Sequence, residues 1–497
     1  MDTNTPLHLD QEVCRQARLA RDPRFDGLFF VGVHSTGIFC RPICPAPSPR
    51  EENVHYYGTA LSALQADLRP CLRCRPESAP GSPAWRGSET TFIRAIKLID
   101  DGQWRAGSLV DFATRLGVTD RYLRKLFQQH LGISPLKYAH FRRTLFAKQL
   151  LQQTSLSIAT IAEMVGFDST RSFNRVFMHW LGINAKTIRR TAEKPKDDSR
   201  ILRLFLSYRP PYDWPTLRDF YLERQIDGIE IIDHQSYGRS FTLPGCEGIF
   251  RAMHIPEQHG FRIALVLTDY AQTIAAVRRI RQLLDLDADP HVIHQHLSRH
   301  LPITELPSTG VRIPGIWSPF EAGVRAIIGQ QISVKAAGKQ VNRLVAKLGR
   351  PVSPSLMTSE LAAIDRHFPD PKTMINADLS FLSITNKRRR SLQLLAAHYL
   401  SHNPSPSDDI DEFSTALQDW LSIPGIGPWT VAYAAMRSGH PNIFLDGDLG
   451  VRHALQRLST ASNLNLQQYK TNLSPWGSYA TISLWQQLSQ AQSEIAQ

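Results

Sequence analysis

A short turn near the end of the chain constrains the fold more than any other stretch. Pro424-Gly-Ile-Gly427 places two glycines one residue apart, which permits positive φ angles and leaves bare backbone N–H groups facing outward. Apolar residues flank the turn, with Leu421 before it and Trp429 after it. The pattern predicts two helices joined by a tight hairpin, and the amides that start the second helix can hold a phosphate. Taken alone, the glycines would also fit an ordinary helix end followed by a turn.

Three further stretches stand in a fixed order around this hairpin. Upstream lies Phe320-Glu-Ala-Gly-Val-Arg-Ala-Ile-Ile-Gly-Gln-Gln-Ile-Ser333, and downstream come Phe444-Leu-Asp-Gly-Asp-Leu449 and Pro475-Trp-Gly-Ser-Tyr-Ala-Thr-Ile-Ser-Leu-Trp485. Together with the hairpin they resemble the helix-hairpin-helix glycosylase superfamily, and most closely the AlkA-type 3-methyladenine DNA glycosylases. The resemblance implies an all-α core that flips an alkylated purine out of DNA and cuts it from its sugar.

The resemblance also assigns roles within the base cleft. It implies that Asp448 is the catalytic carboxylate, which stabilises an oxocarbenium-like sugar and assists the attacking water. Asp446 is the local competitor, and an aspartate before Leu-Gly also commonly caps a helix. Electron-rich rings would bind a cationic base with about 1–2 kcal/mol when desolvated, although the alternative for such rings is a place in the core. The rings expected to bind the base are Trp429, Tyr433 and Trp485.

DNA contacts follow from the same resemblance. Gly425 and Gly427 are expected at the phosphate backbone, and their neighbourhood is expected to hold a structural monovalent or divalent ion on hairpin carbonyls. Gln331 falls where the family places the side chain that fills the gap left by the flipped base, but the AlkA residue there is apolar. Relatives that also cut the strand carry a lysine shortly after the hairpin glycines, where this chain has Trp429. The resemblance therefore implies hydrolysis of the base alone.

Four of the six cysteines form two close pairs, Cys40 with Cys44 and Cys71 with Cys74. Two such pairs predict a tetrahedral Cys₄ zinc site, which in most proteins is purely structural. Six cysteines in 497 residues do not make a disulfide framework, so a reducing cytoplasm is the expected location.

The residues around these cysteines favour a reactive site. The stretch from Phe25 to Cys44, together with Arg69-Pro-Cys-Leu-Arg-Cys-Arg-Pro76, resembles the N-terminal domain of Ada. That family repairs methyl phosphotriesters by moving the methyl group onto a zinc-bound cysteine. The resemblance implies that Cys40 is the acceptor and that the other three cysteines complete the zinc site. Nearby arginines, Arg41 among them, would offset its negative charge and face DNA.

A helical unit occurs twice, at 109–132 and at 158–182. Each copy has a short helix, a glycine turn, a Thr or Ser cap and a second helix, and a helix at 135–153 is expected to connect the copies. The pair resembles an AraC-family DNA-binding domain, and the alternative is a plain helical bundle with a basic face. Six side chains near the starts of the second helices are expected in the major groove, namely Arg121, Arg124, Lys125, Arg171, Asn174 and Arg175.

A small α+β domain is expected between the helix-turn-helix copies and the glycosylase core. Alternating apolar runs at 201–208, 229–234, 237–243 and 261–267 predict strands, and a helix through 277–286 closes the domain. This part resembles the N-terminal domain of AlkA. It shows little chemistry of its own, so we expect it only to brace the next domain.

Charge and hydropathy agree with a DNA-binding protein. The net charge of +12 and the isoelectric point near 9.5 predict an anionic partner. The sequence shows no signal peptide and no apolar run long enough to span a bilayer, so no membrane partner is expected.

We therefore expect a multidomain protein, α+β and mainly α, with a zinc methyl-acceptor domain at 1–80, an AraC-type domain at 85–192, an α+β domain at 200–290 and a glycosylase domain at 300–490. The expected function is a response to alkylation damage. It combines methyl transfer to zinc-bound cysteine, regulation of repair genes with double-stranded DNA and RNA polymerase as partners, and release of 3-methyladenine and 7-methylguanine by a DNA-3-methyladenine glycosylase. The alternative is a transcription regulator whose glycosylase-like half binds DNA without catalysis.

Overall fold

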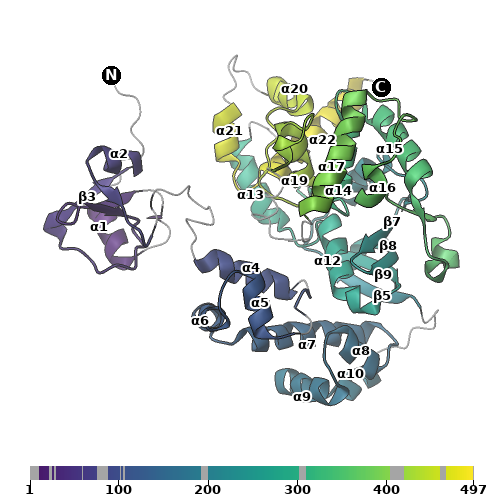
Figure 1. The fold of residues 1–497 in the computed structure, drawn as a ribbon, viewed down its shortest axis with the longest axis horizontal. Coiled ribbons are helices and arrows are strands. Elements are labelled where there is room, and N and C mark those ends of the chain that lie inside the picture. Colours follow the sequence, from purple (N-terminus) through teal and green to yellow (C-terminus); the bar gives the residue numbers. More distant parts are fainter. Residues whose placement is uncertain are drawn as a thin grey trace. The chain divides into compact units, whose positions relative to one another are not determined.

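The structure is a computed structural model (Figure 1). The residues that it describes are 11–21, 25–26, 29–58, 60–74, 76, 88–100, 102–104, 107–191, 200–301, 309–402, 419–458 and 466–495. They belong to two compact units, the first drawn from 1–96 and 109–135 and the second from 97–108 and 136–497. The linker expected at 79–87 lies outside the described residues.

The first unit contains a small sheet that brings the two cysteine pairs together. Its elements are α1 (Gln11–Ala20), β1 (Phe30–Val33), β2 (Ile38–Cys40), β3 (Val54–Tyr57), α2 (Ala60–Gln65) and β4 (Arg69–Pro70). The strand order is β3-β1-β2-β4, with β2 and β4 parallel. β2 ends at Cys40, while β4 leads into Cys71, whose backbone N–H donates to the carbonyl of Phe39 at 2.9 Å. The sheet thus sets one cysteine of each pair side by side.

Both expected helix-turn-helix copies are present. Their helices are α4 (Ser88–Asp100), α5 (Leu109–Arg115), α6 (Asp120–Leu131), α7 (Pro135–Gln153), α8 (Ile158–Met164), α9 (Thr170–Leu181) and α10 (Ala185–Thr191). Thr119 caps α6 and Ser169 caps α9, each accepting a backbone N–H at 3.2 Å. Gly117 and Gly166 make the turns with φ of +70° and +85°. Local cap and turn chemistry therefore fixes each copy.

The second unit contains a five-stranded antiparallel sheet of order β5-β9-β8-β7-β6. Its elements are β5 (Leu202–Ser207), α11 (Trp214–Leu222), β6 (Glu230–Ile232), β7 (Ser236–Leu243), β8 (Cys246–Ile255), β9 (Gly260–Leu267) and α12 (Thr273–Leu283). Each of the four runs expected as strands coincides with a strand to within two residues at either end, and the closing helix is present as α12. The longest strand, β8, and the helix α11 were not expected.

Helix α7 lies against the outer edge of this sheet. The side chain of Gln149 donates to the carbonyl of Phe205 at 3.1 Å, and Gln153 accepts the N–H of Phe205 at 2.9 Å. Apolar side chains of α7, α8 and α9 share one buried core with the sheet. The second helix-turn-helix copy and the sheet are therefore packed together.

Helices make up most of the remaining chain. They are α13 (Pro290–His300), α14 (Pro319–Gly329), α15 (Val334–Leu348), α16 (Pro371–Ile375), α17 (Asn386–His402), α19 (Pro428–Arg437), α20 (Leu449–Leu458), α21 (Leu466–Asn472) and α22 (Gly477–Ile495), beside the short strands β10 (Arg350–Pro351) and β11 (Arg366–His367). One buried core gathers around α14 and the hairpin that precedes α19, and another joins α13 to α20 and α22. A cavity lies between these helices and α11 of the sheet domain.

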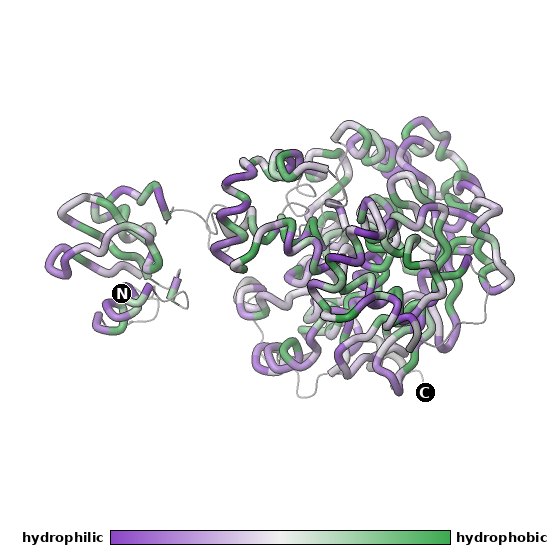
Figure 2. The backbone as a smooth tube through the Cα atoms, turned by 90° about the horizontal axis from the view of Figure 1, so that it is seen from below, coloured by the Kyte–Doolittle hydropathy of each residue, from purple (hydrophilic) through white to green (hydrophobic). Residues whose placement is uncertain are grey.

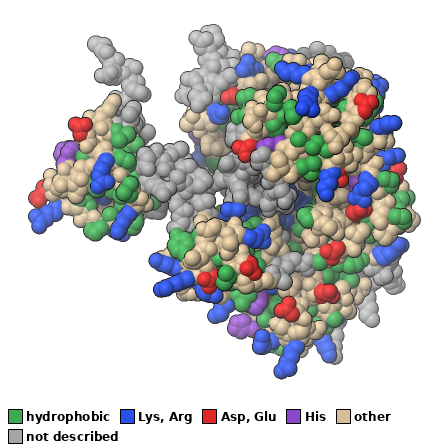
Figure 3. Space-filling view, viewed as in Figure 1, with side chains coloured by type: hydrophobic (Ala, Val, Ile, Leu, Met, Phe, Trp, Pro, Cys, Tyr) green, Lys and Arg blue, Asp and Glu red, His purple; other side chains and the backbone are tan. Residues whose placement is uncertain are grey.

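The distribution of polar residues matches that of a globular protein. Hydrophilic and hydrophobic residues alternate over short stretches of the backbone (Figure 2). Among the described residues no helix is long and apolar enough to cross a membrane. Lysine and arginine side chains are spread over the face in Figure 3, in keeping with the net charge of +12.

Candidate functional site

The two hairpin glycines serve different purposes. Gly425 has φ of +90°, and a Cβ there would lie 2.2 Å from the hydroxyl of Ser391, so glycine is required. Gly427 departs from the expectation of a positive φ, since its φ is −107° and it occupies the N-cap of α19. Nothing lies within 4 Å of the position of a Cβ on Gly427. That open side leaves the helix start accessible to a phosphate.

A cavity of about 700 Å³ lies beside the hairpin and contains Asp448 in its wall. The indole N–H of Trp485 donates to one carboxylate oxygen of Asp448 at 2.9 Å, and that of Trp429 donates to the other at 3.1 Å. The backbone N–H of Val451 adds a third bond at 3.1 Å, so Asp448 also caps α20. The helix-cap and cleft interpretations of Asp448 are therefore compatible. Asp446 instead pairs with Lys470 at 3.8 Å and does not line the cavity.

Two pairs of aromatic rings shape the cavity. Trp429 and Tyr433 stack with centroids 5.2 Å apart, and Phe220 faces Trp485 with centroids 6.4 Å apart and planes only 14° from parallel. A flat base in contact with two parallel rings needs about 7 Å between them. The centroids of Phe220 and Trp485 are therefore slightly closer together than a base between the two rings would need, and we call the region between these rings the slot.

Phe220 corrects the sequence-based expectation about the α+β domain. That domain does more than brace its neighbour, because α11 places the Phe220 ring and, just beyond its end, the Arg224 side chain in the cavity wall. No periodic pattern marks these residues, since α11 is short and Phe220 is only half-buried.

Three arginines surround Tyr433. The guanidinium of Arg437 donates to the Tyr433 hydroxyl at 2.7 Å. Burial alone would raise the pKa of Tyr433, but the positive charges of Arg437, Arg224 and Arg325 lower it below its ordinary value. This end of the cavity is therefore positive, which opposes the attraction that the rings exert on a cationic base.

Gln331 lies on the surface close to the cavity, whose wall includes the neighbouring Gly329 and Ile332. Its φ of +55° is uncommon for a residue with a side chain, and its side-chain oxygen accepts a hydrogen bond from Arg388 at 3.3 Å. The backbone thus holds an exposed polar side chain in a defined direction.

The four paired cysteines form one cluster, in which all sulfur atoms lie within 4.8 Å of one another. The sulfurs of Cys44 and Cys71 are 3.9 Å apart, close to the spacing of about 3.8 Å that follows from four Zn–S bonds of about 2.3 Å in a tetrahedron. Cys71 and Cys74 are buried, whereas Cys40 and Cys44 are partly exposed. The cluster fits one Zn²⁺.

Arg41 lies elsewhere than expected. It is only 7% exposed, its guanidinium forms an ion pair with Asp26, and its backbone N–H points to the sulfur of Cys74 at 3.4 Å. A side chain held in this way braces the cysteine loop from inside and is not free to reach a DNA phosphate.

The side chains expected in the major groove all lie on exposed helix faces. The opposite faces are buried, as Leu123 and Phe127 are on α6 and Phe173 and Phe177 on α9. Arg124 also pairs with Asp120 one turn earlier on α6. The exposed side chains are Arg121, Arg124, Lys125, Arg171, Asn174 and Arg175.

Four family descriptions match consecutive parts of the chain. They are "Metal binding domain of Ada" at 13–77, "Helix-turn-helix domain" at 112–191, "AlkA N-terminal domain" at 203–318 and "HhH-GPD superfamily base excision DNA repair protein" at 324–476. With the four clustered sulfurs, the first match establishes one zinc site. The others confirm the expected fold class and a DNA-binding protein with a DNA glycosylase core.

Among the curated relatives, one matches nearly the whole chain and two others each match a part of it. A "probable bifunctional transcriptional activator/DNA repair enzyme AlkA" of Mycobacterium tuberculosis is 34% identical over 96% of this chain and 97% of its own length. "DNA-3-methyladenine glycosylase 2" of Escherichia coli is 28% identical over 56% of this chain and 95% of its own. The Escherichia coli "bifunctional transcriptional activator/DNA repair enzyme Ada" is 34% identical over 36% of this chain and 49% of its own. The chain therefore belongs to the family of bifunctional transcriptional activators and DNA repair enzymes that join Ada-type and AlkA-type domains.

Proposed function

We propose that the cavity excises alkylated purines, 3-methyladenine and 7-methylguanine, by hydrolysis. The observation that carries the proposal is the Asp448 carboxylate, fixed at both oxygens by Trp429 and Trp485 in the wall of the base-sized cavity. A fixed negative charge at this place stabilises positive charge that develops on the sugar as the base departs. The base itself occupies the slot between Phe220 and Trp485. Release of free methylated purine from alkylated DNA tests the proposal directly.

We expect base removal without strand cleavage. The described residues that line the cavity include no lysine. Lys387 lies near the hairpin, with its Cε 3.9 Å from the position of a Cβ on Gly425, but it is not part of the cavity wall. Water is then the nucleophile, and borohydride treatment during turnover should trap no covalent complex between enzyme and DNA.

Lys387→Ala provides the matched control for this result. If an adduct forms in the wild type and disappears in Lys387→Ala, the hairpin lysine attacks the sugar and the hydrolytic assignment is wrong. If neither protein forms an adduct while both release base, hydrolysis is supported.

We also propose that Cys40 accepts a methyl group from DNA phosphotriesters. Zinc keeps the four cysteines as thiolates at neutral pH. A sulfur lone pair of Cys40 attacks the methyl carbon, the carbon–oxygen bond breaks, and the products are a thioether and a phosphodiester anion. Exposure favours Cys40 or Cys44 over Cys71 and Cys74, which are buried, and Cys74 also accepts the N–H of Arg41 at 3.4 Å. The resemblance to Ada selects Cys40 from the two exposed cysteines. The thioether is a poor leaving group, so each protein acts once.

Methylated protein should bind promoter DNA more tightly than unmethylated protein. The cluster then carries about one formal negative charge instead of about two, and a charge near DNA phosphates is worth roughly 1 kcal/mol in water at short range, or several-fold in affinity. Titration of both forms with DNA should show the difference at low salt and its loss as salt rises. Equal affinities at low salt would contradict this switch.

The regulatory half is proposed to act through the exposed side chains of α6 and α9. Arg121 on α6 and Arg171 on α9 would each enter the major groove, and contact with RNA polymerase would follow from an activator role. We propose that the chain consists of four functional domains, at 1–80, 85–192, 200–290 and 300–490, and that the protein works in the cytoplasm.

A monovalent or divalent ion is proposed at the hairpin. There the Gly425 carbonyl also accepts a hydrogen bond from Gln330 at 3.0 Å.

A further inference from the structure

We propose that Arg224 determines which bases the slot accepts, because it holds the Phe220 ring parallel to Trp485. This inference rests on the proposed excision of bases in the same cavity. It makes Arg224 a positioning residue that acts through Phe220, and Phe220 and Trp485 touch the base.

Arg224 fixes Phe220 from within its own chain segment. The guanidinium carbon lies 3.8 Å from the centroid of the Phe220 ring, which is close for a cation over an aromatic face. The same guanidinium donates to the carbonyl of Phe220 at 3.1 Å and to the carboxylate of Glu223 at 2.9 Å. The guanidinium carbon of Arg437 also lies over this ring, 4.8 Å from its centroid, so Phe220 contacts two cations, and Arg224, the nearer one, is kept in place by two oxygens.

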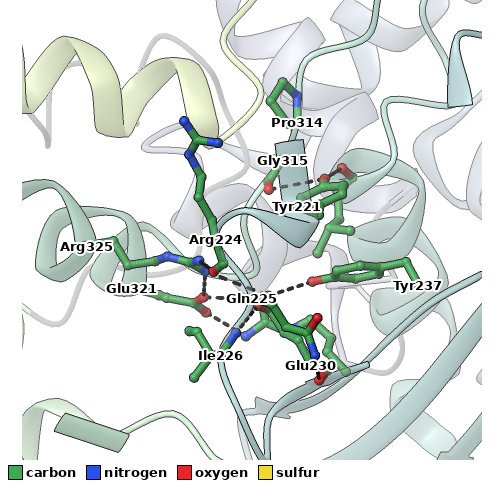
Figure 4. Close-up of polar contacts among 12 residues, drawn as sticks. Tyr221, Arg224, Gln225, Ile226, Glu230, Tyr237, Pro314, Gly315, Glu321 and Arg325 are labelled. Atoms are coloured by element: carbon green, nitrogen blue, oxygen red, sulfur yellow. Dashed lines mark hydrogen bonds and ion pairs between the residues drawn. The ribbon is translucent and has the colours of Figure 1, made fainter. Parts of the chain in front are cut away.

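The backbone of Arg224 is fixed separately from the core of the glycosylase half. Arg325 on α14 donates to the carbonyl of Arg224, and Glu321 on the same helix accepts from Arg325 at 3.0 Å. Two residues later the N–H of Ile226 donates to Glu230 at 2.9 Å. Figure 4 shows the Arg224 side chain pointing away from these contacts, while its backbone faces Arg325. The turn after α11 is therefore held at two points.

Buried charges make this attachment rigid. Glu321 is 1% exposed and Glu230 5% exposed, and the buried Arg239 bonds to both, at 2.8 Å and 3.4 Å. Burial opposes ionisation of Glu321, but Arg239 and Arg325 lower its pKa below the ordinary value. Leaving any member unpaired is strongly unfavourable in such a place. The network therefore fixes the position of the turn after α11 relative to α14.

Rigidity of this wall gives the slot its selectivity. The planes of Phe220 and Trp485 differ by 14° at a centroid distance of 6.4 Å. Dispersion contacts weaken steeply when a gap of about 0.5–1 Å opens, so a tilted Phe220 would hold a damaged base no better than a normal one. With Arg224 in place, only a base that leaves the stack easily and fills the slot gains the full contact.

Arg224→Met tests the inference, because methionine keeps an unbranched side chain on Phe220 but loses the charge and both hydrogen bonds. The Arg224 side chain is 22% exposed and its own partners lie outside the buried network, so the variant should fold. We expect the ratio of 7-methylguanine to undamaged guanine released from methylated DNA to fall about tenfold. Affinity for DNA with a tetrahydrofuran abasic site, which presents no base, should stay unchanged. Arg224→Lys, which restores the cation, should recover part of the ratio.

Arg218→Met is the matched control. Arg218 lies on α11, six residues before Arg224, is 21% exposed and pairs with the adjacent Asp219 at 2.6 Å, but it does not line the cavity. It should leave the ratio unchanged. The positive charge of Arg224 by itself opposes a cationic base, so a raised ratio in Arg224→Met would show that repulsion outweighs ring positioning and would overturn the inference. An unchanged ratio, or a parallel loss of affinity for the abasic DNA, would overturn it as well. Absence of base release by the wild type would instead overturn the proposed excision.

Discussion

Asp448→Asn should lower the rate of base release by on the order of a thousandfold, the size of effect seen when a group that stabilises transition-state charge is removed. Asparagine removes the negative charge that faces the sugar. Asparagine has an NH₂ group in place of one carboxylate oxygen. The indole N–H of Trp429 or of Trp485 then faces another donor and loses its hydrogen bond. Single-turnover release of methylated purines from alkylated DNA measures the rate.

The fold should survive this change, because asparagine caps helices about as well as aspartate and can still accept the N–H of Val451. Asp446→Asn is the matched control, with the same change of charge in the same loop but outside the cavity wall. It should keep nearly full activity. If both variants lose activity equally, the effect belongs to the loop or to general DNA binding and not to a catalytic carboxylate.

Cys40→His should abolish methyl uptake from phosphotriester DNA while base release continues. Histidine can still bind zinc, so the small sheet should stay folded, but its imidazole does not replace a thiolate nucleophile. Transfer of labelled methyl groups to the protein, measured with zinc content, checks the result. Base release continues because Asp448 and its cavity belong to the second compact unit, while Cys40 belongs to the first.

Cys246→Ala is the control for this variant, since Cys246 is a buried cysteine outside the zinc cluster. It should accept methyl groups at the wild-type level. Methyl transfer that persists in zinc-loaded Cys40→His would show that another sulfur of the cluster is the acceptor.

Local signals in the sequence predicted the helical parts well. Thr119 and Ser169 cap their helices through side-chain oxygens within reach of the next turn, so their effect is readable from spacing alone. The same holds for the turn at Gly425, where the backbone angle itself demands glycine. The strand β8 was missed because its residues do not alternate, since both faces of its central part are covered.

The base slot could be predicted only in part. Trp429, Tyr433 and Trp485 belong to motifs that surround the hairpin, whereas Phe220 reaches the slot from another domain through a helix with no distinctive pattern. The positive charge at the Tyr433 end also depends on three arginines that are far apart in the sequence. The sequence placed Arg41 at the DNA because a basic residue follows a zinc-binding cysteine. Its ion pair with Asp26, which holds the side chain inside the domain, cannot be seen from that position in the sequence.

The contact between α7 and β5 has a consequence for how such a protein can be divided. An outer strand with free N–H and C=O groups invites pairing with other chains, and proteins commonly protect such strands against aggregation. Here Gln149 and Gln153 occupy the outward groups of Phe205 in the way that a neighbouring strand would. A glycosylase fragment that begins after the helix-turn-helix copies would lose these two side chains and leave the outward N–H and C=O groups of Phe205 open to other chains. We therefore expect such a fragment to aggregate more readily than the intact chain unless other polar side chains take the places of Gln149 and Gln153.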